Sequence, residues 1–147
     1  GLKNNYRLPF DLTDSLFNDA TIISDKIENA LKQANLEIQL KDLEVGKLTK
    51  DQKINEIMDE DFNTANLITY LLELVKELNT ELRQKKDFVE TYDKINLINY
   101  ILGLKYDFVK LSNEDKNIYN KWLEYRENKD FENADKMRDI LTDKKII

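Results

Sequence analysis

The stretch NTANLITYLLELVKELNTELR, residues 63–83, decides the fold class of this chain. Its leucines recur at steps of three and four residues, the spacing that gathers side chains on one face of an α-helix. The apolar stripe comprises Leu67, Leu71, Leu74, Leu78 and Leu82, and it is widened by Ile68, Leu72 and Val75. Other helices must cover so wide an apolar face, so we expect this helix to be the most buried element of an all-α bundle.

Two weaker patterns precede this stretch. Residues 11–34 repeat apolar side chains at helical spacing, and Asp11 or Thr13 is the expected N-cap because its side-chain oxygen can accept a free first-turn amide. Residues 36–48 are less regular, and they predict a weak helix or an ordered connector with Gly46 as its stop.

Shorter helices are expected on both sides of the central stretch. Thr49 is expected to open one that continues through Met58. Another follows a charged turn, and its apolar face comprises Phe88, Tyr92, Ile95, Ile98 and Leu102. Gly103 can provide the left-handed cap that ends this second helix. Connections this short join antiparallel neighbours, so these segments predict an antiparallel helical bundle.

A second, smaller unit follows where the helical pattern breaks, between residues 106 and 112. We place the bundle over residues 1–110 and a small, mostly helical C-terminal appendage over residues 111–147. Ser112-Asn113-Glu114-Asp115 is typical of a helix start, and a further helix is expected from about Asp130. A unit this short cannot bury a large core, so it must dock on the bundle or belong to something larger.

The composition excludes much enzyme chemistry. The 147 residues include no His and no Cys, so the chain lacks thiol nucleophiles, disulfides and the ligands of a Cys/His zinc site. One Pro and three Gly leave few residues for tight hairpin turns, which disfavours an all-β fold. The chain begins at Gly1 instead of Met, which fits either a tag remnant or a segment of a longer protein.

The net charge of -6 argues against indiscriminate binding of nucleic acid or anionic membranes, because such binding needs bulk positive charge. No apolar run approaches the roughly 18 residues that span a bilayer, and the N-terminus shows no signal-peptide pattern. We therefore expect a cytoplasmic protein with no membrane partner.

One group of polar residues resembles a metal site only in part. Asp59, Asp61 and Asn63 have the spacing that opens a calcium-binding loop. Thr64 stands where that loop needs Gly, and Tyr70 stands where it needs a bidentate Glu. An acidic helix start that complements the helix dipole is the better interpretation.

Aromatic side chains of the smaller unit raise the question of base stacking. Tyr119 and Trp122 share a helical face with apolar neighbours, so we interpret them as core. Phe131 and Asp135 differ, because they lie one turn apart beside the apolar face of their helix. Such a ring can stack on an unpaired base, the carboxylate can accept hydrogen bonds from guanine or cytosine, and Arg126 can hold a phosphate or stack. From spacing alone, an ordinary salt-bridged surface remains the alternative.

Three stretches match the signatures of one protein family. They are Tyr6-Arg7-Leu8-Pro9-Phe10, then Met58-Asp59-Glu60-Asp61-Phe62-Asn63-Thr64 and, over residues 126–141, the pattern R-x-x-K-D-[W/F]-x-x-A-D-x-[I/M]-R-x-x-L. In this order and at these separations they resemble the C-terminal part of bacterial cysteinyl-tRNA synthetases, whose signatures include M-D-D-D-F-N-T. The resemblance covers most of the chain, and it is poorest over residues 36–52.

The resemblance implies a DALR-type helical bundle over residues 1–110 and a truncated anticodon-binding unit over residues 111–147. It implies binding of cysteine-specific tRNA, with Arg126, Phe131 and Asp135 at the GCA anticodon and Phe131 in place of the more usual Trp. The parent protein is expected to be an aminoacyl-tRNA ligase, whereas this chain holds no catalytic, cofactor or metal site. ATP, magnesium and zinc are expected in the enzyme's own catalytic domain, outside this chain, which would be its other partner.

The charge distribution qualifies the expected tRNA binding. Residues 1–110 carry 15 basic and 20 acidic groups, whereas residues 112–147 carry 8 and 9. Because cations drive general binding to phosphates, we expect this chain alone to bind tRNA weakly and in a salt-sensitive manner. A free-standing helical module that binds a protein partner is the alternative function, and an enzyme with a carboxylate-only site is a distant third.

Overall fold

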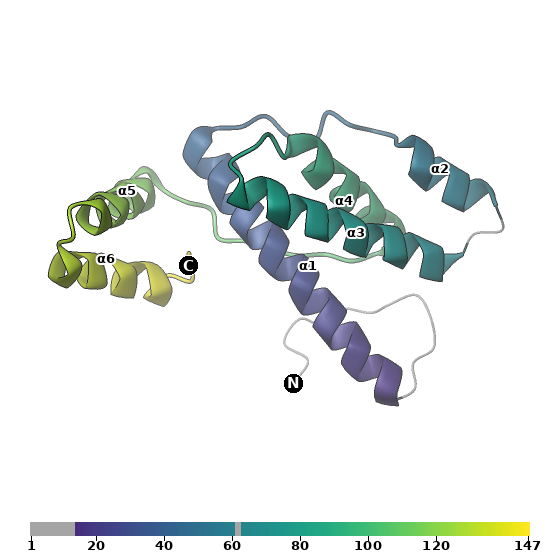
Figure 1. Cartoon of the computed structure of the whole chain (residues 1–147), viewed down its shortest axis with the longest axis horizontal. Coiled ribbons are helices and arrows are strands. Elements are labelled where there is room, and N and C mark those ends of the chain that lie inside the picture. Colours follow the sequence, from purple (N-terminus) through teal and green to yellow (C-terminus); the bar gives the residue numbers. More distant parts are fainter. Residues whose placement is uncertain (1–13, 61–62) are drawn as a thin grey trace. The chain divides into compact units, whose positions relative to one another are not determined.

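The computed structural model describes residues 14–60 and 63–147, with side chains from residue 19 onward. Within these residues the backbone forms six α-helices and no strand, which confirms the all-α class (Figure 1). None of the helices in this part of the chain combines the length and apolar character that crossing a membrane requires. The N-cap predicted at Asp11 or Thr13 and the family-like stretch at residues 6–10 lie outside the described residues.

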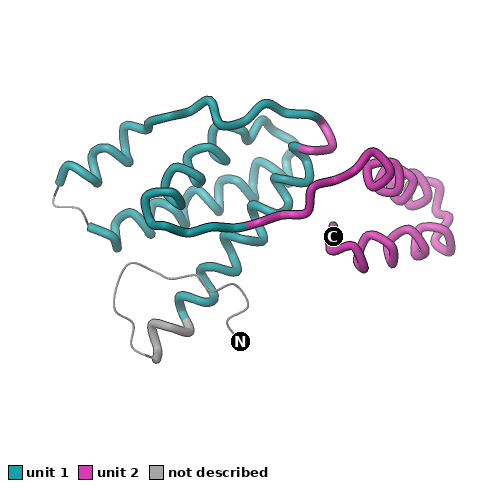
Figure 2. Tube along the Cα trace, turned by 180° about the vertical axis from the view of Figure 1, so that it is seen from behind, with its two compact units in different colours: residues 1–38, 42–106 teal, residues 39–41, 107–147 magenta. Residues whose placement is uncertain are grey.

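The described residues divide into two compact units (Figure 2). Unit 1 comprises the described residues up to 38 together with residues 42–106. Unit 2 comprises residues 39–41 together with residues 107–147. Each unit has its own buried apolar side chains, and the last three residues of the first helix belong to unit 2.

The first helix of unit 1, α1 (Asp14–Lys41), is longer than its sequence pattern predicts. The prediction of a separate weak helix or connector over residues 36–48 is wrong in its first part, because α1 continues unbroken to Lys41. Ile38 follows Ala34 by one turn and both are buried, so the apolar face extends past residue 34. The helix ends where Asp42 adopts a left-handed conformation, with φ 50°, and the Leu43 amide donates to the Ile38 carbonyl.

A buried carboxylate orders the connector after α1. Asp93 lies on α4 (Val89–Leu102), and its side chain is only 5% exposed. Its two oxygens accept hydrogen bonds from the Gly46 amide at 2.8 Å and the Leu48 amide at 3.3 Å. Gly46, with φ +86°, therefore lies inside this connector, and the prediction that it stops a helix is wrong.

Helix α2 (Gln52–Asp59) has its N-cap at Asp51, two residues later than the start predicted at Thr49. The Asp51 carboxylate caps the helix by accepting a hydrogen bond from the Ile54 amide at 3.1 Å. It also accepts one from the Tyr70 hydroxyl at 2.9 Å, which ties the start of α2 to α3. Burial, and next the hydrogen bond to Asp51, raise the pKa of Tyr70 above its ordinary value.

Helix α3 (Thr64–Arg83) is the central helix that the sequence predicts. Its buried residues are Leu67, Tyr70, Leu71, Leu74, Val75 and Leu78, whereas Leu82 at the end of the stripe is half-buried. Helix α4 packs beside α3 as its antiparallel neighbour (Figure 1). The apolar face predicted for residues 88–102 is buried in full, and Gly103 caps α4 with φ +73° as predicted.

Unit 2 is built on a hairpin of two helices, α5 (Asn113–Glu127) and α6 (Phe131–Asp143). Ser112 and Asp115 form a capping box at the start of α5, which confirms the predicted helix start. The buried apolar residues of this unit are Leu111, Ala134, Leu141 and Ile146. Residues 39–41 also belong to this unit, and the Gln39 side chain donates to the Val109 carbonyl at 2.9 Å and accepts from the Leu111 amide at 2.8 Å.

Candidate functional site

The link between α5 and α6 brings the last turn of one helix beside the first turn of the other. Lys129 adopts a left-handed conformation, with φ 61°, and its amide donates to the Arg126 carbonyl at 3.1 Å. The Asp130 amide donates to the Tyr125 carbonyl at 2.8 Å. These two bonds form a Schellman motif, which satisfies the last carbonyls of α5 while the chain reverses. The end of α5 and the start of α6 therefore present their side chains at one end of the hairpin.

Phe131 is held in an exposed position by the cap that starts α6. The Asp130 carboxylate accepts hydrogen bonds from the Asn133 backbone amide at 3.4 Å and from Asn133 Nδ2 at 2.7 Å. Ala134 and Leu141 are buried in the interior of unit 2, whereas Phe131 is 63% exposed. The Phe131 ring therefore lies outside the core, and its face is available for stacking.

Asp135 lies one helical turn after Phe131 on α6, so the two side chains share one side of the helix. Its side chain is exposed, and no residue in the described part of the chain bonds to its carboxylate. This distinguishes it from Asp130, whose carboxylate is occupied in the cap. Asp135 therefore keeps its full capacity to accept hydrogen bonds.

Arg126 reaches the same end of the hairpin from α5. Its guanidinium carbon lies 4.9 Å from the centre of the Trp122 ring. Trp122 packs edge-on against Tyr119, with their ring centres 5.4 Å apart. Both aromatics are only partly buried, so their interpretation as core is only partly right. A guanidinium stacked in this way keeps its N–H donors free in its plane, where they can meet a phosphate or a base edge.

The stacking of Arg126 on Trp122 goes beyond what the sequence predicts. The signal for it is the spacing of four residues, which places the two side chains one above the other on a helix. The hairpin thus presents an aromatic face, a free carboxylate and a positioned cation. These are the groups with which proteins recognise unpaired bases in RNA.

The opposite end of the hairpin is fixed by an ion pair. Lys144 Nζ donates to Asp115 Oδ1 at 2.8 Å. This hydrogen bond, followed by the one from the Ser112 amide, lowers the pKa of Asp115 below its ordinary value. The same bond raises the pKa of Lys144. Because Asp115 lies in the first turn of α5 and Lys144 follows α6, the pair ties the start of one helix to the end of the other.

The residues that open a calcium-like loop do not form a metal site in the described structure. Asn63 caps α3, because its side-chain oxygen accepts the amides of Ala65 at 3.0 Å and Asn66 at 3.3 Å. Asp61 lies outside the described residues. Across residues 14–60 and 63–147, no group of three acidic, His or Cys side chains could hold a metal ion. The zinc that the family resemblance implies needs Cys and His ligands, which this chain lacks, so its residues do not fit that metal.

Known proteins are similar to this chain along nearly all of its length. Residues 53–107 match the family model of the DALR domain. Over 99% of its length the chain is 31% identical to the cysteine–tRNA ligase of Mycoplasma mycoides subsp. mycoides SC and 32% identical to that of Mesoplasma florum. It is 30% identical, again over 99% of its length, to the cysteine–tRNA ligase of Listeria innocua serovar 6a.

The match covers only part of each relative. The chain corresponds to 34% of the first two ligases and 35% of the third, so it spans about a third of the length of the curated relatives it matches. No solved structure matches the chain. The chain is therefore similar, along nearly all of its length, to about a third of these cysteine–tRNA ligases, and its residues 53–107 match the DALR domain.

Proposed function

We propose that this chain is the C-terminal, tRNA-positioning and anticodon-reading part of a cysteine–tRNA ligase. The observation that carries the proposal is the exposed Phe131 ring with the unpaired Asp135 carboxylate one turn away. In this function the α5–α6 hairpin contacts the anticodon of cysteine-specific tRNA, and the helices of unit 1 support it as the DALR bundle. ATP-dependent attachment of cysteine takes place in a separate catalytic domain of the same enzyme, which is the second partner of this region.

Each of the three side chains has a distinct task in the proposed contact. Phe131 stacks on an unpaired base, and Asp135 accepts hydrogen bonds from the edge of guanine or the amino group of cytosine. Arg126, held on the Trp122 ring at 4.9 Å, neutralises a phosphate or stacks on a neighbouring base. Stacking on a base, or a pair of hydrogen bonds to its edge, contributes about 1–3 kcal/mol to the binding free energy. Removing the Phe131 ring or the Asp135 carboxylate should therefore weaken binding by about 5- to 150-fold.

Binding of two tRNAs tests the proposal. The 147-residue chain is titrated at low salt with a tRNA that carries the GCA anticodon and with the same tRNA after its anticodon has been changed. The unmodified chain should bind the first RNA more tightly. Phe131→Ala and Asp135→Asn should weaken binding to the first RNA and bring its dissociation constant close to that of the second.

The matched control is Asp143→Asn, which removes an exposed carboxylate from the last turn of the same helix. This variant should keep the preference for the GCA anticodon. Thermal melting followed by circular dichroism checks that each variant is folded. Equal affinity of the unmodified chain for both tRNAs would contradict anticodon reading.

A further inference from the structure

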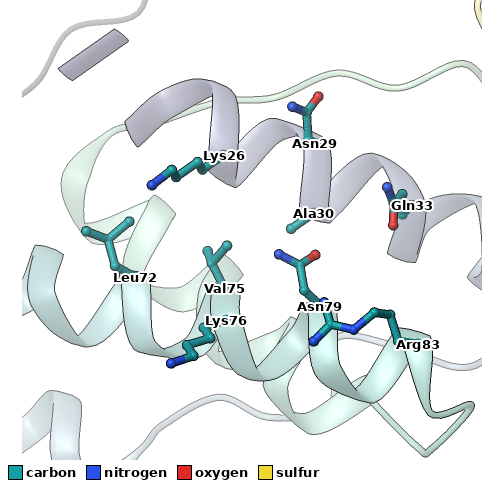
Figure 3. Close-up of a pocket in the computed structure, with 9 residues that line it drawn as sticks. All are labelled: Lys26, Asn29, Ala30, Gln33, Leu72, Val75, Lys76, Asn79 and Arg83. Atoms are coloured by element: carbon teal, nitrogen blue, oxygen red, sulfur yellow. The ribbon is translucent and has the colours of Figure 1, made fainter. Parts of the chain in front are cut away.

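Unit 1 has a groove between α1 and α3. Its volume is about 880 Å³, and four residues of α1 and five of α3 line it. Figure 3 shows the α1 side chains along one wall and the α3 side chains along the other. Two of these residues, Ala30 and Val75, are buried and form an apolar base, whereas the side chains around them are mostly polar. The groove therefore presents polar side chains around an apolar base.

The charged side chains that line the groove are all basic, and they are Lys26, Lys76 and Arg83. Helices α1 and α3 together contain five basic and eight acidic residues. Three of the five basic residues line the groove, whereas none of the eight acidic ones does so. In a chain with a net charge of -6, this separation of charge creates a local site for an anion.

These cations have no anionic partner within the described part of the chain. None of the ion pairs between described residues includes Lys26, Lys76 or Arg83. Arg83 donates one hydrogen bond, from a guanidinium nitrogen to the Thr80 hydroxyl at 3.2 Å. An external anion therefore meets cations that it need not displace from a carboxylate.

Amide side chains alternate with the cations, and they are Asn29, Gln33 and Asn79. An amide donates to phosphate oxygens and also accepts a hydrogen bond from a ribose hydroxyl, which a lysine cannot do. Lys76 and Arg83 are seven residues apart, or about 10 Å along the helix axis. Figure 3 shows Lys26 and Lys76 toward one end of the groove, with Gln33 and Arg83 toward the other. Charge spread over this length suits successive phosphates better than one compact anion.

We infer that the groove between α1 and α3 binds the sugar–phosphate backbone of RNA. The inference rests on the proposed function, because the RNA is the tRNA that this chain is proposed to position. Backbone contacts supply affinity without sequence information, whereas the α5–α6 hairpin supplies the preference for an anticodon. The two sites therefore affect different observables and can be tested separately.

The test compares two triple variants of the 147-residue chain that remove the same charge. The groove variant is Lys26→Gln, Lys76→Gln and Arg83→Gln. The control variant is Lys32→Gln, Lys86→Gln and Lys105→Gln, whose lysines also belong to unit 1 but do not line the groove. Affinity for the GCA tRNA and for the tRNA with a changed anticodon is measured at several salt concentrations.

The groove variant should bind both tRNAs about tenfold more weakly and keep the ratio between them unchanged. Affinity decreases with salt, so the plot of log affinity against log salt concentration has a negative slope. This slope should become shallower by about 2 to 3, because each lost phosphate contact removes about 1 from its magnitude. The control variant should change the slope by less than 1. Equal losses of tRNA affinity in the two variants would overturn the inference that the groove binds RNA, because they would show only general electrostatic attraction. Equal affinity of the unmodified chain for both tRNAs, with the groove effect intact, would instead overturn anticodon reading alone.

A second measurement keeps the inference testable if the triple variant does not fold. Lysines of the unmodified chain are acetylated with and without bound tRNA and located by mass spectrometry. Bound tRNA should protect Lys26 and Lys76 from acetylation but should not protect Lys32. If Lys26 and Lys76 react equally with and without RNA, the inference that the groove binds RNA is wrong. Poly-glutamate of matched charge serves as a competitor, and protection of the same lysines by it instead of by tRNA would assign the groove to an acidic protein segment.

Discussion

At the scale of single residues, the ends of the helices show the consequence of a chain with only three glycines. Five of the six described helices are followed by a residue with positive φ: Asp42, Lys85, Gly103, Lys129 and Lys145. Only one of the five is glycine, although an L-residue in this conformation costs about 1–2 kcal/mol. The lysines accept this conformation because the amides after each turn satisfy carbonyls of the preceding helix.

Exchanging residues at two of these caps should change stability in opposite directions. Lys85→Gly should raise the free energy of unfolding by about 1 kcal/mol, because glycine adopts φ 55° without strain. Gly103→Ala should lower it by about the same amount. No atom lies within 4 Å of the Cβ that alanine would add at Gly103, so this loss reports the backbone alone. Urea denaturation measures both changes, and Lys86→Gly, at a neighbouring residue without positive φ, should give no gain. A loss of stability in Lys85→Gly would contradict this account of the caps.

At the scale of helices and their links, features that depend on nearby residues could be predicted from the sequence. Features that depend on residues far along the chain could not. Helix α3 and the start of α5 follow from apolar spacing and from a cap that involves residues within three positions. The connector at Gly46 depends on Asp93, which lies 47 residues further along the chain, so no local pattern reveals it. The candidate site divides in the same way. Spacing predicts that Phe131 and Asp135 share one side of α6, whereas the exposure of Phe131 depends on how α6 packs in unit 2.

The ion pair between α5 and the end of α6 should make unit 2 sensitive to pH at both extremes. The folded pKa of Asp115 is lowered, so its contribution to stability is full above its ordinary value of 3.8 and is lost as pH falls through the folded pKa. The folded pKa of Lys144 is raised, so its contribution is full below its ordinary value of 10.5 and is lost as pH rises through the folded pKa. Asp115→Asn removes the charge while keeping an oxygen that can accept the Ser112 amide.

The gap in urea midpoint between the unmodified chain and Asp115→Asn measures this pH dependence. At pH 7 the unmodified chain should have the higher urea midpoint. The difference between the two midpoints should decrease as pH falls below 3.8, and it should also decrease as pH rises above 10.5. Glu124→Gln removes an exposed acid from the same helix and should show no such dependence. A gap that stays constant from pH 7 down to strongly acidic pH would contradict the role of the Asp115–Lys144 pair.

At the scale of the whole molecule, the division into two units predicts that unfolding has two separable parts. Unit 2 has few buried apolar side chains, so its local stability depends on each of them. The single tryptophan of the chain, Trp122, lies in unit 2, and its fluorescence therefore reports that unit. Most described helical residues belong to unit 1, so circular dichroism reports chiefly that unit.

Removing one core leucine from each unit should separate these two signals. Leu141→Ala deletes a side chain with no exposed surface from unit 2, which costs about 2–5 kcal/mol and should lower the fluorescence midpoint far more than the circular dichroism midpoint. Leu71→Ala deletes a similarly buried side chain from α3. It should lower the circular dichroism midpoint far more than the fluorescence midpoint. Both midpoints are read from one urea titration of each variant, with Leu123→Ala as the exposed control in unit 2. Equal shifts of both probes in both core variants would mean that the chain unfolds as one cooperative unit, and the division seen in the backbone would then have no energetic counterpart.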